Sequence, residues 1–539
     1  MLCCLPALAQ TKSDLQGTAR VFDLEFTSQE LDTLYSDVLD NLANYKAMHK
    51  LSLNNNVPLS LWQNPALPGM KFDQKQRPII WPKSIATLPA NKSDLAFYSI
   101  DQLAYLIKSK QITSLDLTRF FIERIKKHGD ALQCVVSLQE EIAFKQARQA
   151  DREIATGKYR GLLHGIPYGL KDLFAIKGTK TTWGAAPYKD QTIDEDAYVY
   201  QRLRDAGAVL VAKFSLGALA MGDYWYGGRT KNPWNLRYGS SGSSAGSASA
   251  TVAGLVPFAI GTETWGSIVS PSTTCGATGL RPTFGSVSRS GAMALSYSLD
   301  KIGPICRSAN DAAIVFSFIH GTDGQDLAAV NRPFNYDANR SLKGMKIGYA
   351  KNYFDKIKDT TMNEWKVISL LKKQGVQLIP VDFPDSTAYP FNIIDVVINA
   401  ERGAQFDELT RNNVDDLLTR QNKSDLPNRF RTSRFIPAVE YINAQRHRYL
   451  LMQKVNAVVS QFDAIICPSR GGGNQSAITN LTGHPVVCVP NGFDSKTKLP
   501  TGISFVGKLY DEGTILRVAK FYQDLTNYDE AHPKQFMLD

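Results

Sequence analysis

The feature that most constrains the fold is a run of twelve residues at 239–250, GSSGSSAGSASA, in which every residue is Gly, Ser or Ala. Such a composition can belong to a flexible linker. Here, however, the run is followed almost at once by 252–260 (VAGLVPFAI), an apolar segment typical of a protein core. Small side chains in a buried segment let backbones approach each other or close around a ligand. We therefore expect a buried segment near a functional site.

Short β-branched runs bounded by Gly or Pro alternate with amphipathic stretches of helical period. This alternation is typical of an α/β fold with a largely covered central sheet. No repeat of fixed period is visible, so we expect one large catalytic domain over 96–530. The strand candidates are 207–211, 256–260, 345–348, 376–380, 464–466, 485–488 and 503–506, and the helix candidates are 99–126, 138–156, 196–206 and 309–320.

The residues before this domain predict an N-terminal extension. Residues 10–95 are polar and loosely helical, and they become rich in proline after residue 57. A helix is expected to start near Ser28, which would cap it, and to continue with Leu31, Leu34 and Leu39 at roughly helical spacing. We expect the extension to lie across the surface of the larger body.

The first nine residues, MLCCLPALA, predict a targeting signal. Their apolar run ends in Ala7-Leu8-Ala9 before Gln10, which is the small-x-small pattern of a signal-peptidase site, although a positively charged leader is missing. We interpret residues 1–9 as a truncated signal peptide and expect an exported, periplasmic protein. The alternative is a frayed terminus of a cytoplasmic protein. No later stretch has the ~20 uninterrupted apolar residues of a membrane span.

Composition excludes several classes of protein. Apolar residues make up 43% and charged residues 21% of the 539 residues, which argues against a disordered chain, a collagen-like repeat or a coiled coil. The net charge of +10 is not concentrated in basic runs, so nucleic-acid binding is not expected. The seven cysteines form no metal-ligand spacing, and most of them lie in apolar runs. We expect no metal site.

Two serine mechanisms can be read from the residues themselves. Residues 242–246 (GSSAG) match the G-x-S-x-G nucleophile elbow, which requires an acid and a histidine downstream. Of His320, His447, His484 and His532, only His484 lies in a suitable loop, and chance matches are common where six of twelve residues are serine. The other mechanism uses Lys171, which follows Leu170 in an apolar stretch. A buried lysine favours the neutral amine, which can act as a base toward a serine hydroxyl, although a lysine with a buried stem and a solvated tip is the simpler interpretation.

Several ordered motifs decide between these mechanisms. Segments 164–178 (HGIPYGLKDLFAIKG), 239–247 and 261–271 (GTETWGSIVSP) together resemble the amidase signature family. The likeness extends from about 97 to 525 and includes 205–213 (DAGAVLVAK), 232–235 (NPWN), 279–289 (GLRPTFGSVSR), 298–304 (SLDKIGP) and 480–485 (NLTGHP). It implies a large mixed β-sheet flanked by helices, and a cofactor-free amide hydrolase with a Ser–cis-Ser–Lys triad.

The resemblance assigns roles to individual residues. Lys171 matches the family's base and Ser267 its nucleophile, while Ser243 matches the bridging serine on a cis peptide bond. The backbone N–H groups of Thr264, Trp265 and Gly266, together with that of Ser267, fall where the family forms its oxyanion hole.

The chain also departs from the family's usual Gly-Thr-Asp-Thr-Gly-Gly-Ser-Ile-Arg. It has Glu263 for Asp, Trp265 for the first of the paired glycines and Val269 for Arg, and Ala245 replaces a further glycine. Trp265 either forms an apolar wall beside the oxyanion hole or packs into the core. These variants are closest to the peptide amidase branch, whose members hydrolyse terminal carboxamides. Candidates for the acyl pocket, between residues 384 and 457, are Phe391, Ile394, Phe406, Phe430 and Tyr441.

The resulting hypothesis is a stand-alone hydrolase that cleaves the C–N bond of a small-molecule or peptide amide through a serine acyl-enzyme. One alternative is the glutaminase subunit of a tRNA-dependent amidotransferase, which shares the fold and the triad but needs partner subunits. Another is a catalytically inactive binding protein on the same scaffold. The sequence leaves the oligomeric state open, and a homodimer is one of the alternatives.

If residues 1–9 are a cleaved signal, the mature protein isolated from its native host should begin at Gln10. N-terminal sequencing measures this directly. A mature chain that still begins at Met1 would contradict the export hypothesis.

Overall fold

The computed structural model describes residues 11–22, 24–48, 50, 55, 61, 63–385, 393–470 and 473–537. The predicted signal at 1–9, the acyl-pocket candidate Phe391, and Cys3 and Cys4 lie outside the described residues. The other five cysteines are free and buried, as expected for small core side chains.

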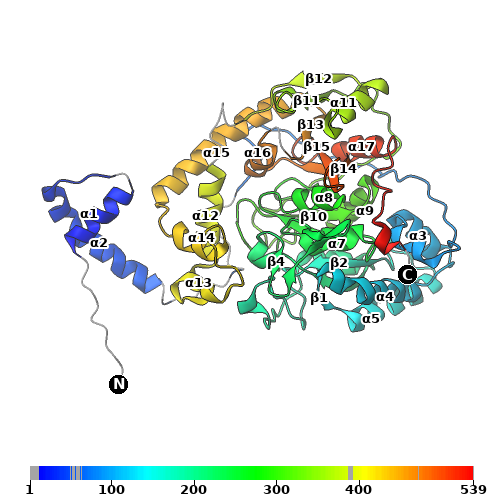
Figure 1. Cartoon of the computed structure of the whole chain (residues 1–539), viewed down its shortest axis with the longest axis horizontal. Coiled ribbons are helices and arrows are strands. Elements are labelled where there is room, and N and C mark those ends of the chain that lie inside the picture. Colours follow the sequence, from blue (N-terminus) through cyan, green and yellow to red (C-terminus); the bar gives the residue numbers. More distant parts are fainter. Residues whose placement is uncertain are drawn as a thin grey trace.

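A single mixed sheet forms the centre of the described structure (Figure 1). Strand β2 is parallel to β3 and β8, and β11 is parallel to β12 and β13, whereas the other neighbours are antiparallel. This confirms the predicted mixed α/β fold. In spatial order the strands are β1 (Val135–Leu138), β3 (Val209–Phe214), β2 (Pro167–Lys171), β8 (Ala259–Glu263), β10 (Lys301–Cys306), β9 (Thr278–Arg281), β14 (Val486–Phe493), β15 (Pro500–Val506), β13 (Ala464–Pro468), β11 (Ile347–Ala350) and β12 (Leu378–Val381).

Three central strands are absent from the strand candidates of the sequence. Strands β2 (PYGLK), β9 (TGLR) and β10 (KIGPIC) contain Gly or Pro, which are depleted in strands. Their residues are nevertheless buried. They are strands because neighbours on both sides supply hydrogen-bond partners, which local composition does not reveal.

Helices cover the sheet and extend to one side of it. The predicted helical stretch 99–126 is two helices, because the chain turns before Thr113 caps a new helix start. The helices are α3 (Ile100–Lys108), α4 (Ser114–Leu132), α5 (Glu140–Ala155), α6 (Tyr198–Asp205), α7 (Ala245–Val252), α8 (Val269–Cys275), α9 (Ala309–Ile319), α10 (Lys351–Phe354), α11 (Asn363–Lys373), α12 (Ile393–Gln405), α13 (Asp407–Arg411), α14 (Leu426–Ser433), α15 (Ala438–Val459), α16 (Gln475–Thr482) and α17 (Glu512–Gln523). Every helix in the described part of the chain is too short or too polar to traverse a lipid bilayer.

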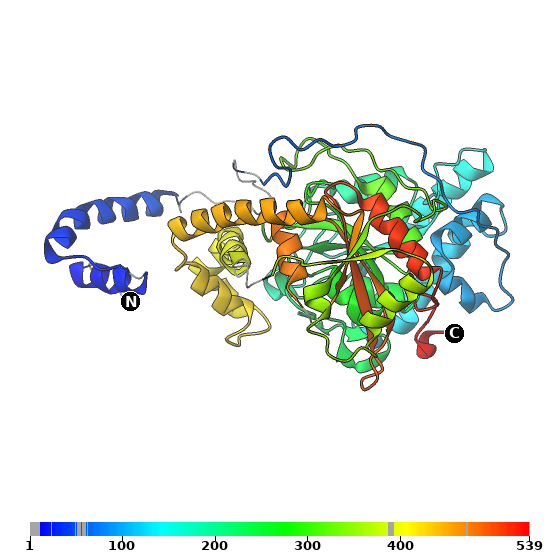
Figure 2. The ribbon, with the colours of Figure 1, turned by 90° about the horizontal axis from the view of Figure 1, so that it is seen from above.

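The N-terminal extension begins with a helical hairpin, α1 (Lys12–Val21) and α2 (Ser28–Met48), which lies beyond α12–α15 from the sheet (Figures 1 and 2). The cap of α2 is Thr27, not Ser28 as predicted. The Glu30 N–H donates to Thr27 Oγ1 over 3.3 Å, and the Thr27 N–H donates to Glu30 Oε2 over 2.7 Å. This reciprocal capping box requires a spacing of three residues, which only Thr27 has.

The extension then crosses the surface of the body (Figure 2). Ile80 forms a bridge with Asp337, and the Gln76 side chain donates to the backbone of Phe334 over 2.8 Å. Between the hairpin and this crossing, Asn55 contacts residues of the catalytic body, as described below.

The Gly/Ser/Ala run contains the buried helix α7. A Cβ atom at Gly246 would lie 2.6 Å from the carbonyl oxygen of Cys134 and from the amide nitrogen of Ser215. Such an approach is closer than van der Waals contact allows, so glycine is required here. The run is a packed element and not a linker, in agreement with the sequence analysis.

Candidate active site

Lys171 is the last residue of β2 and is completely buried. Its Nζ lies 2.8 Å from Ser243 Oγ, 2.8 Å from Thr262 Oγ1 and 3.1 Å from Ser244 Oγ. These three partners are neutral hydroxyls, and the Thr262 carbonyl oxygen, 3.5 Å from Nζ, is also neutral. Burial lowers the pKa of Lys171 to about 7, although the more distant Asp300 and Glu263 act in the opposite direction. At neutral pH a substantial fraction of the amine is therefore in its neutral form.

A second buried lysine shows what a counter-charge changes. Lys213 Nζ, on β3, lies 2.7 Å from Asp172 Oδ1, and both side chains are fully buried. It also donates to Thr181 Oγ1 over 2.7 Å. Burial lowers the pKa of Lys213 as well, but the paired Asp172 carboxylate acts in the opposite direction. Lys171 has no such partner among its hydrogen bonds to the described residues, which makes it the better base.

Ser243 and Ser244 connect Lys171 to strand β8. The Gly242–Ser243 peptide bond is cis. Ser244 Oγ accepts from the Thr262 N–H and donates to the Thr262 carbonyl, both over 3.1 Å. Ser244 is thus occupied by the strand backbone and by Lys171, while Ser243 Oγ is bonded to Lys171 alone among the described residues. Ser243 is free to transfer a proton onward.

Ser267 lies beside this pair in the turn between β8 and α8. The Ser244 N–H donates to the Ser267 carbonyl over 3.1 Å. The described hydrogen bonds do not include one between the hydroxyls of Ser243 and Ser267. Catalytic hydrogen bonds are often long without substrate and tighten when it binds. Ser267 is 8% exposed, so its side chain is close to the surface of the site.

The backbone around Ser267 presents unpaired N–H groups. In the part of the chain that the structure describes, residues 264–267 donate no backbone hydrogen bond. Gly266 has a φ of +84°, which glycine tolerates best, and a Cβ atom there would lie 2.9 Å from Ser270 Oγ. The turn therefore offers adjacent donors of the kind that an oxyanion hole requires.

Glu263 shapes this turn. Its Oε2 accepts from the N–H groups of Ile268 and Val269, each over 2.9 Å, at the start of α8. Its Oε1 accepts from Arg281 over 2.9 Å and from Asn480 over 2.8 Å. Burial alone would raise the pKa of Glu263, but Arg281 and these hydrogen bonds lower it to about 2. The charged carboxylate thus binds the two amides that follow Ser267 and leaves those of 264–267 available.

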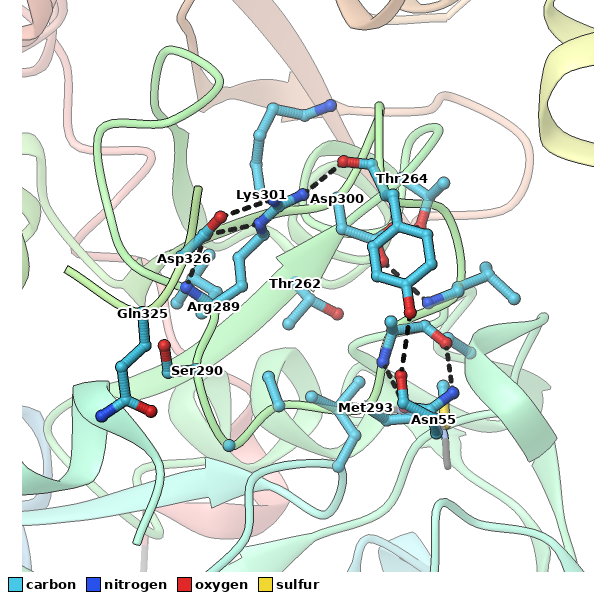
Figure 3. A pocket seen from close by; sticks show the side chains of 18 of the residues that line it. Asn55, Thr262, Thr264, Arg289, Ser290, Met293, Asp300, Lys301, Gln325 and Asp326 are labelled. Atoms are coloured by element: carbon cyan, nitrogen blue, oxygen red, sulfur yellow. Dashed lines mark hydrogen bonds and ion pairs between the residues drawn. The ribbon is translucent and has the colours of Figure 1, made fainter. Parts of the chain in front are cut away.

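A cavity of about 260 Å³ opens beside the turn (Figure 3). Thr262 and Thr264 line the cavity. Since Thr262 is also hydrogen-bonded to Lys171, only the Thr262 side chain separates this part of the cavity from Lys171. Thr264 Oγ1 donates to Asp300 Oδ1 over 2.6 Å, and Asp300 Oδ2 accepts from the N–H groups of Leu295 and Ser296. Asp300 therefore connects the cavity loop 292–297 to the turn of residues 264–267.

Another part of the cavity wall contains an ion pair. Arg289 donates to both carboxylate oxygens of Asp326 over 2.7 Å and to the Tyr297 carbonyl over 2.6 Å. Figure 3 shows these side chains beside Thr262. Since the guanidinium is already paired, it positions the loop and does not offer a free charge to a substrate.

The structure does not support the alternative of a nucleophile elbow at residues 242–246. Its serine, Ser244, is bonded to β8 and Lys171, and no histidine in the described ranges hydrogen-bonds to Ser243, Ser244 or Ser267. The His484 ring is buried against Thr482, and burial lowers its pKa to about 3. The match of GSSAG to the elbow pattern is a coincidence of composition.

The departures from the family pattern have different structural outcomes. Two roles were expected for Trp265, an apolar wall or a core side chain. Because Trp265 is 39% exposed, the expectation that it packs into the core is wrong. Val269 is buried in an apolar cluster with Leu299 and Leu481. An arginine at position 269 would have to place its charge in this cluster, so valine is the better fit here.

The acyl-pocket candidates separate into wall and core residues. Phe406 lines a second cavity of about 750 Å³. Ile394 and Phe430 are core side chains, and Tyr441 donates its hydroxyl to Glu401 over 2.9 Å. Sequence reasoning missed Thr262, Asp300 and Asn55 as site residues, and it considered Ser244 only as the serine of the nucleophile elbow. Asp300 lies in the quoted SLDKIGP motif, whereas nothing in the sequence around Asn55 singles it out.

Comparison with known proteins places the chain in a family. Residues 116–472 match the family described as Amidase. The chain is 31% identical over 480 residues to a glutamyl-tRNA(Gln) amidotransferase subunit from Coxiella burnetii, a match that covers 81% of this chain and 99% of that protein. Its structure is similar to that of peptide amidase from Stenotrophomonas maltophilia, with a TM-score of 0.71, 28% identity and coverage of 81% and 98% of the two chains. A bacterial aryl acylamidase with 23% identity and a TM-score of 0.70 shares the fold.

The chain belongs to the amidase signature family. It is an amide hydrolase with the large mixed sheet of that family. Both statements confirm what the sequence motifs predicted.

The pairing of Glu263 with Arg281 is expected to be essential for stability. Glu263→Gln leaves a buried, unpaired guanidinium, so the free energy of unfolding should fall by ~3–5 kcal/mol in urea denaturation. The double variant Glu263→Gln/Arg281→Met removes both charges and should recover a large part of this loss. A loss below ~1 kcal/mol in the single variant would show that the carboxylate does not hold the turn.

Proposed function

We propose that the protein hydrolyses carboxamide C–N bonds with Ser267 as nucleophile, Lys171 as base and Ser243 as the proton relay between them. The observation that supports this most directly is the buried Lys171 Nζ, 2.8 Å from Ser243 Oγ and bonded only to neutral groups among the described residues. An isolated neutral amine is a competent base, whereas an ion-paired ammonium is not.

The proposed reaction follows from these positions. Neutral Lys171 takes the proton of Ser243 Oγ, which takes that of Ser267 Oγ as this oxygen attacks the carbonyl carbon. The carbonyl oxygen becomes an oxyanion bound by the N–H groups of 264–267, each of which contributes about 3 kcal/mol in comparable sites. The proton returns through Ser243 to the departing nitrogen when the C–N bond breaks. Water then attacks the acyl ester by the same proton path and releases the acid and Ser267.

A terminal carboxamide is the substrate that we favour. The likeness to a peptide amidase supports it, as does the position of the cavity beside the oxyanion turn. The leaving group of such a substrate is ammonia, which needs little space. The cavity lined by Thr262 and Thr264 would therefore receive the acyl part.

A second candidate is the glutaminase subunit of a tRNA-dependent amidotransferase, because a glutamyl-tRNA(Gln) amidotransferase subunit is 31% identical to this chain. The two functions differ in their need for partners. Purified protein should hydrolyse a panel of primary amides and anilides by itself if it is a stand-alone amidase. Activity that appears only with tRNA and partner subunits would favour the second candidate.

The pH dependence of kcat/KM should report the titration of Lys171. The catalytic form is the neutral amine, so the rate should rise through a pKa of about 7 and reach a plateau above it. Lys171→Arg keeps a cation of similar length that cannot deprotonate, and it should be inactive at every pH. If kcat/KM of the native protein were the same below and above the pKa of about 7, this would contradict the role of Lys171.

Serine substitutions should separate the nucleophile from its neighbours. Ser267→Ala should abolish labelling by a fluorophosphonate probe, and Ser243→Ala should lower kcat by ~10²–10⁴-fold, the range for lost proton transfer. Ser247→Ala is the matched control, because Ser247 lies in the same run but donates to the Ile260 carbonyl over 3.1 Å. Labelling that persists in Ser267→Ala would exclude Ser267 as nucleophile.

A further inference from the structure

Asn55 is a residue of the N-terminal extension that contacts the cavity loop. Its Nδ2 donates to the Ala294 carbonyl over 2.9 Å, and the Ala294 N–H donates to its Oδ1 over 2.8 Å. The Tyr297 hydroxyl donates to the Asn55 carbonyl over 3.2 Å. One side chain and its backbone thus bind the loop at three points. Figure 3 shows Asn55 beside Met293, across the cavity from Gln325.

Asn55 also contacts the helical side of the molecule. Its Nδ2 donates to Gln405 Oε1, at the end of α12, over 3.3 Å. The same amide therefore bridges the cavity loop and α12. These partners lie more than two hundred residues away in the sequence, so Asn55 is bound specifically and does not simply rest on the surface.

The two cavities meet at this residue. Asn55 lines both the cavity of about 260 Å³ beside Thr262 and Thr264 and the cavity of about 750 Å³ that is bounded by α12 and α13. Its loop partners Ala294 and Tyr297 line the first cavity, and its helix partner Gln405 lines the second. Among the described residues that line these cavities, Asn55 is the one that belongs to both.

The second cavity suits an apolar group. Trp183, Phe406 and Leu409 contribute to its wall. The carboxylate of Asp407, also in the wall, is paired with Arg411 over 2.7 Å and with Arg434. Both arginines are paired with Asp407, and Glu408 also lines the cavity, so an aliphatic or aryl group can enter without breaking these ion pairs.

We propose that Asn55 is a specificity-determining residue, the wall between the two cavities that limits the length of the acyl group. This inference rests on the proposed function, in which the cavity beside Thr264 receives the acyl part. A cavity of 150 Å³ holds benzene, so one of about 260 Å³ accommodates roughly ten non-hydrogen atoms. An acyl group that extends past Asn55 enters the second cavity, which Asn55 also lines.

The experiment compares chain lengths in Asn55→Ala and in the native protein. Ammonia release is measured for straight-chain primary amides from butanamide to dodecanamide. The native protein should lose kcat/KM beyond octanamide to decanamide, and Asn55→Ala should raise the ratio of long-chain to short-chain kcat/KM by about tenfold or more. Asn64→Ala is the matched control, because the Asn64 side chain accepts only from the nearby Ala66 N–H among the described contacts, and its ratio should stay native.

A ratio in Asn55→Ala that equals the native ratio would overturn the proposal, and so would an equal loss of activity on all chain lengths, which indicates a merely structural role. Gln405→Ala, which opens the wall from the α12 side, should change the ratio in the same direction as Asn55→Ala.

If the protein hydrolyses none of these amides, the proposed function is rejected. A binding measurement then still tests whether Asn55 separates the two cavities. ω-Bromododecanoate quenches tryptophan on contact, and Trp183 lines the second cavity. The contribution of Trp183 is the part of the quenching that disappears in Trp183→Phe. This part should be strong in Asn55→Ala and weak in the native protein. Equal quenching of Trp183 in both proteins, or none in either, would show that Asn55 does not separate the cavities.

Discussion

The site depends on an amine that is removed from water without receiving a counter-charge. Lys171 ends a strand in the interior of the sheet, and the groups that replace its hydration are three hydroxyls. Desolvation penalises the ammonium form, and neutral acceptors compensate for only part of that penalty. Lys213 is equally buried but has Asp172 2.7 Å away. The surroundings of the two lysines therefore differ by one carboxylate within hydrogen-bond distance.

The turn of residues 264–267 is organised by two carboxylates, those of Glu263 and Asp300. Glu263 binds the first amides of α8 and is held by Arg281 and Asn480. Asp300 binds Thr264 on one side and the cavity loop on the other. Both carboxylates bind backbone N–H groups. The positive charge next to Glu263 comes from Arg281, whereas Val269, where the family usually has arginine, lies in an apolar cluster.

Much of the fold was predictable from the sequence, and so was the contact between Lys171 and Ser243 that the structure shows. The alternation of strands and helices predicted the α/β class, and the motifs around Lys171, Ser243 and Ser267 predicted the family. The strands β2, β9 and β10 were not predictable, because their Gly and Pro residues disfavour strands locally. Asn55 could not be predicted either, since its partners Ala294 and Gln405 are distant in the sequence.

The sequence by itself determined which residues are small, apolar or reactive, and therefore that the Gly/Ser/Ala run is packed and that a lysine and two serines are available for catalysis. Only the tertiary structure decided what surrounds them. It placed neutral hydroxyls around Lys171, gave Lys213 its carboxylate and brought Asn55 between two cavities. The physical reason is that a pKa and the shape of a cavity depend on distances of a few ångströms between side chains, and folding sets these distances between residues that are far apart along the chain.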